Sequence, residues 1–152
     1  MTAGRQMAGV IEEPGANPEP KEVMTAEILA MRSGLSVKFL KPVNKTGIKT
    51  PDALFGDGSV WEFKVPEVYH GKTVKNQFKK ALGKGTDKLL ISGVLIGAAL
   101  SELVWDVCTL LETGEFAEIR EVLVLPKSGE LAYIKRGPLL DTGELNPGKK
   151  RP

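Results

Sequence analysis

The stretch Thr50–Lys64, TPDALFGDGSVWEFK, determines how we interpret this chain. Residues 53–55 and 59–64 are rich in apolar side chains, and the segment Gly56-Asp57-Gly58 between them is typical of a tight turn. The stretch therefore predicts a β-hairpin in which the glycine-rich segment supplies residues of positive φ.

Side chains of the second strand alternate between the two faces of the predicted sheet. Trp61 and Phe63 share one face, whereas Glu62 and Lys64 fall on the other. We expect Trp61 and Phe63 to be core residues and not base-stacking surfaces. The other face then carries a carboxylate and an ammonium group, and the hairpin can fold back to bring Asp52 beside them.

Asp52, Glu62 and Lys64 form a set with a chemical use. Two carboxylates and a backbone carbonyl make an oxygen site suited to Mg²⁺ or Mn²⁺. Such an ion polarises a phosphoryl oxygen and lowers the pKa of water, and a neighbouring lysine can orient that water or stabilise developing negative charge. The alternative interpretation is a surface strand with a solvated Glu–Lys pair, because Glu-x-Lys occurs by chance in many chains.

Composition narrows the class of protein only in part. The chain has 152 residues, of which 41% are hydrophobic and 26% charged, as expected for one globular domain with a real core. A single cysteine, Cys108, excludes an internal disulfide and a cysteine-rich zinc site. No apolar run is long enough for a membrane span, and the first residues lack the apolar region of a signal peptide. The net charge of +2 does not by itself indicate nucleic-acid binding.

The distribution of lysines says more than the net charge. Basic segments flank the hairpin in sequence and would suit a phosphate backbone. They contain Lys38, Lys41, Lys45 and Lys49 before it, and Lys72, Lys75, Lys79, Lys80, Lys84 and Lys88 after it. For any single lysine, an ordinary solvated position is the alternative.

The order of predicted elements indicates an α/β protein with a mixed central sheet flanked by helices. We expect a flexible arm or linker over residues 1–20, a folded domain over 21–136 and a basic tail over 137–152. The expected elements are a helix over 22–33 ended by Gly34, a strand over 35–40, the hairpin, a helix over 73–82, a strand over 87–92, a helix over 98–112, and a second hairpin of strands 119–125 and 131–135.

The helix after the hairpin supplies candidate substrate contacts. We expect Lys75, Lys79 and Lys80 to contact phosphates beside the hairpin, and Gln77, three residues before Lys80, to face the same site. His70, in the preceding loop, is the single histidine of the chain, and we interpret it as an exposed loop residue.

The pattern Pro51-Asp52, followed ten positions later by Glu62-Phe63-Lys64, resembles the PD-(D/E)xK nuclease superfamily. The element order is similar to that superfamily's restriction-endonuclease-like core over about residues 22–135. The resemblance implies that Asp52, Glu62 and the Phe63 carbonyl bind Mg²⁺, with Mn²⁺ or Zn²⁺ as other candidates, and that Lys64 is the catalytic lysine. It also implies that Glu27, on the first helix, points into the site and helps to hold water there; the alternative is a surface glutamate.

A closer resemblance is carried by several short motifs. They are Glu27–Gly34, Thr50-Pro51-Asp52, Trp61–Lys64, Asn76–Ala81 and Leu89-Leu90-Ile91. Together they look like the C-terminal tRNA-nuclease toxin domains of contact-dependent growth inhibition proteins (the CdiA type) and of related phage-borne or polymorphic toxins. Members often carry a glutamine where the second helix ends, and here Gly83-Lys84-Gly85 stands instead.

This resemblance implies partners and a place of action. The substrate would be nucleic acid, with tRNA favoured over DNA. The domain would be delivered from a larger secreted protein, act in the cytoplasm of the target cell, and be blocked by a cognate immunity protein. Two other classes stay open: a non-enzymatic nucleic-acid-binding module with a nuclease fold, and an interaction domain of a phage or secreted protein.

Overall fold

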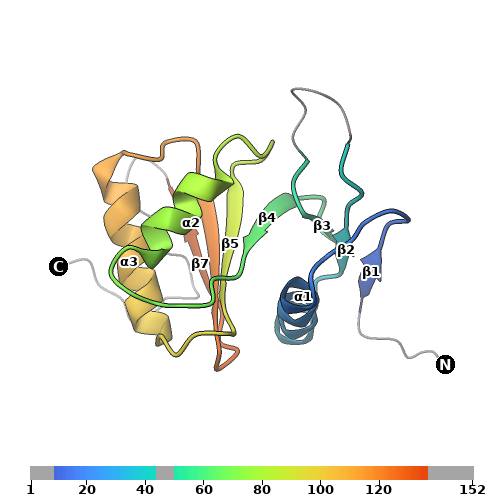
Figure 1. Ribbon diagram of the computed structural model, residues 1–152, viewed down its shortest axis with the longest axis horizontal. Helices are drawn as coiled ribbons and strands as arrows, with labels where there is room; N and C mark the ends of the chain where they lie inside the picture. The colour runs from blue at the N-terminus through green and yellow to red at the C-terminus, as the bar shows by residue number, and fades with distance from the viewer. Residues whose placement is uncertain (1–8, 44–49, 137–152) are drawn as a thin grey trace.

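The computed structural model describes residues 9–43 and 50–136, which form a seven-stranded sheet with three helices (Figure 1). In chain order the elements are β1 (Val10–Glu12), α1 (Pro20–Ser33), β2 (Val37–Phe39), β3 (Ala53–Phe55), β4 (Val60–Lys64), α2 (Thr73–Ala81), β5 (Lys88–Gly93), α3 (Leu100–Thr113), β6 (Glu121–Pro126) and β7 (Ala132–Lys135).

The strands follow one another along the sheet in the same order as along the chain. β2, β3 and β4 form an antiparallel meander, whereas β4, β5 and β6 run parallel. Parallel neighbours need long crossovers, and α2 and α3 supply them. β1 joins β2 in parallel, and β7 pairs antiparallel with β6. The α/β class and the mixed sheet predicted from the sequence are therefore confirmed.

The helices cover opposite faces of the sheet, with α1 on one side and α2 and α3 together on the other (Figure 1). An aromatic core lies beneath α1. In it, the rings of Phe39 and Phe63 meet edge-on at 5.7 Å, and Phe55 stacks on Trp61 at 5.3 Å. Trp61 is 4% exposed and Phe63 2%, so the prediction that both are core residues is confirmed.

The opposite face of β4 is covered as well, which the alternating pattern did not predict. Glu62 is only 3% exposed, because its neighbour across the sheet, Leu89, belongs to the second core beneath α2 and α3. A strand in the middle of a sheet with helices on both sides is buried on both faces. Glu62 is therefore a buried carboxylate and not a solvated one.

The first turn of α1 is fixed by local hydrogen bonds. The helix starts at Pro20 because Glu22 closes a capping box, in which its Oε1 accepts the N–H of Glu19 at 2.9 Å. Gly34 ends the helix with φ of +76°, as predicted. This start places Glu22, and not a later residue, at the end of the helix that lies near β4.

The predicted flexible arm over residues 1–20 needs correction in its described part. Val10–Glu12 pairs with β2 as an edge strand, and α1 already includes Pro20. Three paired residues among several glycines and prolines are too short a run to give a periodic signal. Residues 1–8, the segment 44–49 with its two lysines, and the predicted tail over 137–152 lie outside the described residues.

None of the three described helices is both long and apolar enough to cross a membrane.

Candidate active site

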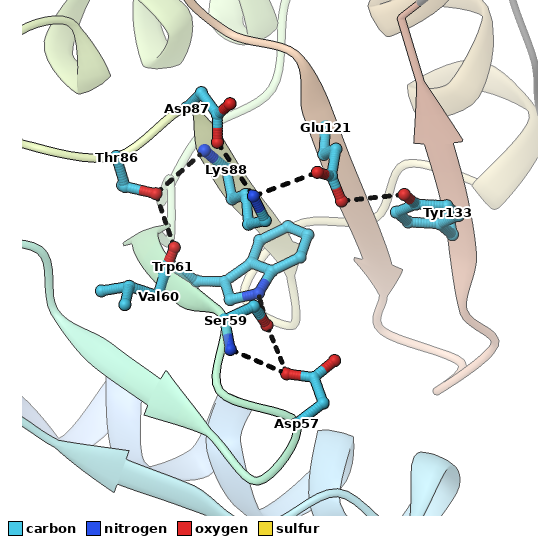
Figure 2. A network of polar contacts seen from close by, with 9 residues as sticks. All are labelled: Asp57, Ser59, Val60, Trp61, Thr86, Asp87, Lys88, Glu121 and Tyr133. Carbon is cyan, nitrogen blue, oxygen red and sulfur yellow. Dashed lines mark hydrogen bonds and ion pairs between the residues drawn. The ribbon is translucent and has the colours of Figure 1, made fainter.

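The β3–β4 hairpin carries the predicted site residues and has a tightly bonded turn. Within residues 56–58, positive φ occurs at Gly58 alone, at +91°, so the turn needs less glycine than the sequence suggested. The indole N–H of Trp61 donates to the Ser59 hydroxyl at 2.7 Å, and the Ser59 backbone N–H donates to Asp57 at 2.9 Å (Figure 2). These bonds fix the direction in which β4 leaves the turn.

A second set of polar contacts holds the start of β4 against β5 and β6 (Figure 2). The Thr86 hydroxyl donates to the carbonyl of Val60 and accepts the N–H of Lys88. The Lys88 ammonium in turn lies 3.0 Å from Asp87 and 3.1 Å from Glu121. The amino-terminal ends of the central strands are thus held together before the site residues are reached.

The predicted residues Asp52, Glu62 and Lys64 come together along the second strand of the hairpin. Asp52 directly precedes β3, and its Oδ2 accepts the backbone N–H of Phe63 at 2.8 Å. The Nζ of Lys64 lies 3.2 Å from Oε2 of Glu62. A second cation, Lys84 in the loop between α2 and β5, approaches the same oxygen at 4.0 Å. No pattern in the sequence distinguishes Lys84 from the other lysines that follow the hairpin.

The electrostatics of the site raise the pKa of both carboxyl groups. Burial raises the pKa of Glu62 to about 7, the charge of Asp52 adds to the rise, and Lys64 and Lys84 oppose it. Burial also raises the pKa of Asp52, against the lowering effect of the Phe63 N–H. Two buried carboxyl groups this close ionise together only at a cost, which a bound cation would remove.

The donor atoms fit a divalent cation with oxygen ligands. Oε1 of Glu62 is buried and has no hydrogen-bond partner in the described part of the chain, and such an orphaned oxygen is costly unless something satisfies it. Residues 9–43 and 50–136 contain no cluster of three or more His, Cys, Asp or Glu side chains suited to a metal. An ion at Asp52 and Glu62 would therefore complete its shell from backbone, water or substrate, as Mg²⁺ commonly does and structural zinc does not.

A cleft of about 480 Å³ lies at the carboxyl end of β4, between the start of α1 and α2; we call it the α1–α2 cleft. Its lining consists of Glu19, Lys21, Glu22, Phe63, Lys64, Val65, Pro66, Glu67, Val68, His70, Thr73, Asn76, Gln77 and Lys80. Phe63 and Lys64 belong both to this lining and to the carboxylate site, so the two are continuous. Ligands of open α/β sheets bind at such strand ends, where flanking helices lie on opposite faces.

The helix glutamate that lines the cleft is Glu22, whereas Glu27 does not line it. Burial raises the pKa of Glu22, and the nearby charge of Asp52 adds to the rise. Glu27 lies more than a turn further along α1 and is half-buried. The structure thus does not bring Glu27 to the carboxylate site. The signal that could have identified Glu22 is the Glu19–Glu22 capping box, which locates the start of the helix.

One side of α2 faces the cleft. Gln77 and Lys80 line it, as the sequence analysis expected of this helix. Asn76 lines it too; it belongs to the motif Asn76–Ala81 but was not among the predicted substrate contacts. His70 is exposed, as predicted, but it also belongs to the lining.

The other two predicted contacts of α2 lie elsewhere. Nζ of Lys75 is 3.6 Å from Oε2 of Glu115, just beyond the end of α3. Lys79 is exposed and lies outside the cleft lining. The helical period explains the difference, because positions 75 and 79 share a side of the helix that turns away from positions 76, 77 and 80.

No family model matches the chain, and no curated protein matches it. Among solved structures, a chain of the CdiA-CT/CdiI toxin and immunity complex from Burkholderia pseudomallei is similar, with a TM-score of 0.62. That chain shares the fold. The alignment covers 84% of this chain and 100% of the other at 17% sequence identity, so the likeness concerns the α/β architecture.

Proposed function

We propose that this chain is a metal-dependent endonuclease of the PD-(D/E)xK type that serves as a toxin domain. The observation that carries the proposal is the meeting of Asp52, Glu62 and Lys64 beside the α1–α2 cleft. The toxin role is supported by the shared fold, because the similar chain comes from a complex described as toxin and immunity protein.

Each residue of the site has a role in phosphodiester hydrolysis. The carboxylates of Asp52 and Glu62, with the Phe63 carbonyl, would hold Mg²⁺ or alternatively Mn²⁺ or Zn²⁺. When bound, the ion supplies Lewis-acid stabilisation of the phosphoryl oxygens. Lys64 holds its ammonium 3.2 Å from Glu62, where it can orient the attacking water and stabilise negative charge.

Glu22 is the candidate for the role that the sequence resemblance gave to Glu27. It lies in the cleft lining beside the charge of Asp52. A carboxylate there can accept a hydrogen bond from water and keep that water near Lys64. Glu27 would then have no role in the reaction and would be only a half-buried residue at the edge of α1.

The substrate is nucleic acid, with tRNA favoured and DNA as the other candidate. The carboxylates alone would repel phosphates, so cations near them must attract the substrate. Lys80 lines the cleft, whereas Lys75 and Lys79 lie on the side of α2 that turns away from it and can contribute only to a more distant backbone path. A cognate immunity protein is the expected inhibitor, and the domain would act in the cytoplasm of a target cell after delivery from a larger secreted protein.

The test is cleavage of total RNA and of plasmid DNA by the purified chain, with Mg²⁺ and with EDTA. Wild-type protein should cut in Mg²⁺ and stop in EDTA. Asp52→Asn and Lys64→Ala should lose activity by about 10²-fold or more. Asp57→Asn is the matched control, because Asp57 is an exposed acid of the same hairpin outside the cleft lining.

Two results would contradict the proposal. Cleavage that persists in EDTA or in Asp52→Asn would place the reaction elsewhere. Binding of nucleic acid without any cleavage in Mg²⁺, Mn²⁺ or Zn²⁺ would identify a non-enzymatic binding module instead.

A further inference from the structure

The charges in the lining of the α1–α2 cleft are balanced, which is unusual for a path that follows phosphates. The lining contains three glutamates and three lysines. Grooves that track a nucleic-acid backbone are dominated by cations instead. Most of this cleft therefore suits an uncharged polar group better than a phosphate.

The lysines of the lining are also largely neutralised by ion pairs. Lys21 lies 3.1 Å from Glu67 and 4.0 Å from Glu19, and Lys64 is paired with Glu62. Among the cleft lysines, only Lys80 has no ion pair within the described residues. A phosphate would pair with Lys64 or Lys80, at the edges of the cleft. The interior of the cleft would then be left for an uncharged group.

The wall formed by α2 carries an accessible hydrogen-bond acceptor on a side chain that is otherwise buried. Gln77 is 7% exposed, and its Nε2 donates to the carbonyl of Thr73 at 3.2 Å. That bond fixes the amide, and its Oε1 accepts no hydrogen bond in the described part of the chain. Asn76, the next residue and half-buried, adds a second amide to the same lining. A ligand with N–H donors could hydrogen-bond to the amide oxygens of these two side chains.

The loop before α2 adds a further polar group. Nδ1 of His70 accepts the N–H of Lys72 at 3.1 Å, which orients the imidazole and leaves Nε2 as its second polar atom. The whole cleft, which this ring and α2 both line, has a volume of about 480 Å³, within the usual range for sites that hold a small organic group.

We propose that the α1–α2 cleft holds one unstacked nucleobase next to the scissile phosphate, with Gln77 and Asn76 contacting its amino-bearing edge. This inference rests on the proposed nuclease function and narrows its substrate. A base inside a duplex cannot enter the cleft, and unstacking is least costly in single strands and loops. The substrate class is therefore unpaired nucleic acid, with a preference for bases that carry an exocyclic amino group.

Oligo(C) and oligo(U) test this preference, because they differ at the edge where cytosine has an amino donor and uracil a carbonyl acceptor. Binding is measured by fluorescence anisotropy in EDTA, where no cleavage occurs. The wild-type chain should bind oligo(C) more tightly than oligo(U), by about two- to tenfold, as expected for one or two hydrogen bonds. Oligo(dC) in a parallel arm distinguishes RNA from DNA.

Gln77→Met keeps the size of the side chain and removes its amide, so it should abolish the preference for oligo(C). Asn76→Ala, at a less buried position, should weaken oligo(C) binding by about two- to tenfold. Neither change removes a cation, so the dependence of affinity on salt should stay the same. Asn17→Ala is the control, because this exposed amide lies outside the lining.

The outcomes separate this inference from the proposed function. Equal binding of oligo(C) and oligo(U) by the wild type, a preference that survives Gln77→Met, or unchanged affinity in Asn76→Ala would each overturn the nucleobase site. Metal-dependent cleavage that requires Asp52 would still stand in those cases. If the wild type neither bound nor cut any nucleic acid, the proposed function itself would fail.

Discussion

The carboxylate of Asp52 accepts the backbone N–H of Phe63 across the hairpin at 2.8 Å. Because Phe63 lies between Glu62 and Lys64 in β4, this bond holds the Asp52 carboxylate beside the strand that carries the other two site residues. The hairpin backbone therefore fixes the positions from which the three side chains extend into the site.

Glu62→Gln should stabilise the metal-free protein at neutral pH. The pKa of Glu62 is about 7 in the folded protein against an ordinary 4.5, so the folded state keeps a proton that the unfolded chain has lost. The contribution of Glu62 to stability therefore falls as pH rises from about 4.5 to about 7, by up to about 3 kcal/mol. Urea unfolding in EDTA, compared between the two proteins at about pH 5 and about pH 8, measures this difference.

Glutamine cannot lose a proton, so the free energy of unfolding of the variant should increase relative to that of the wild type as pH rises. Glu12→Gln is the matched control, since Glu12 is exposed on β1. A difference between Glu62→Gln and wild type that does not change with pH would contradict the assignment of the raised pKa.

Glu22→Gln and Glu27→Gln form a matched pair on one helix. Glu22→Gln should slow metal-dependent cleavage by about tenfold or more, since it removes a carboxylate from the cleft beside Asp52. The glutamine oxygen can still cap α1, so thermal unfolding should change little. Glu27→Gln should leave cleavage rates unaltered. Loss of activity in Glu27→Gln alone would restore the role predicted for Glu27 from the sequence.

Lys84→Ala should move metal binding to higher pH. Nζ of Lys84 lies 4.0 Å from Glu62, and its charge lowers the pKa of both Glu62 and Asp52. Without it, both carboxyl groups hold their protons to higher pH and compete longer with the ion. Isothermal titration with Mn²⁺ over a pH series gives the pH of half-maximal binding, and Lys79→Ala should not move it. A downward shift in Lys84→Ala would refute this role.

Lys80→Ala and Lys75→Ala should differ in their effect on nucleic-acid binding. Lys80 lines the cleft, so its loss should weaken binding of all sequences and reduce the salt slope by about one. Lys75 is paired with Glu115 on the far side of α2, so its substitution should change neither quantity. Equal losses for both variants would mean that the substrate crosses α2 outside the cleft.

Gly58→Ala should destabilise the hairpin by about 1–3 kcal/mol, because an alanine is strained at φ of +91°. Gly97→Ala is the control: the position has no positive φ, a Cβ there meets no atom within 4 Å, and the change should stay within about 0.5 kcal/mol. Urea midpoints measure both. An unchanged midpoint in Gly58→Ala would show that the turn can relax.

The hairpin, the order of the elements and the core positions of Trp61 and Phe63 were predictable because they depend on local signals. Alternation with a period of two and a glycine turn are visible within fifteen residues of sequence. The burial of Glu62 was not predictable in this way, since it depends on α2 packing on this face of β4 and on the neighbouring strand β5, whose Leu89 lies in the core beneath α2 and α3.

Residues that reach the site from other elements were harder to find than those on the hairpin. Glu22 reaches the cleft because α1 begins at Pro20, whereas Glu27 was selected only through the resemblance to the nuclease superfamily. Lys84 reaches Glu62 from the loop between α2 and β5, and no periodic pattern in the sequence predicts the direction of that loop. Gln77 and Lys80 were identified because they share a helix side, which spacing alone reveals.

The described strands pair only with their neighbours along the chain. No pairing requires a segment from the opposite end of the domain, so contact order is low for a mixed sheet and each loop closes over a short separation. Folding can therefore proceed from either end and add one strand at a time. If the chain is delivered unfolded, as the proposed function implies, the pairing of β3 with β4 alone would bring Asp52 back beside Phe63, before the last strands had joined the sheet.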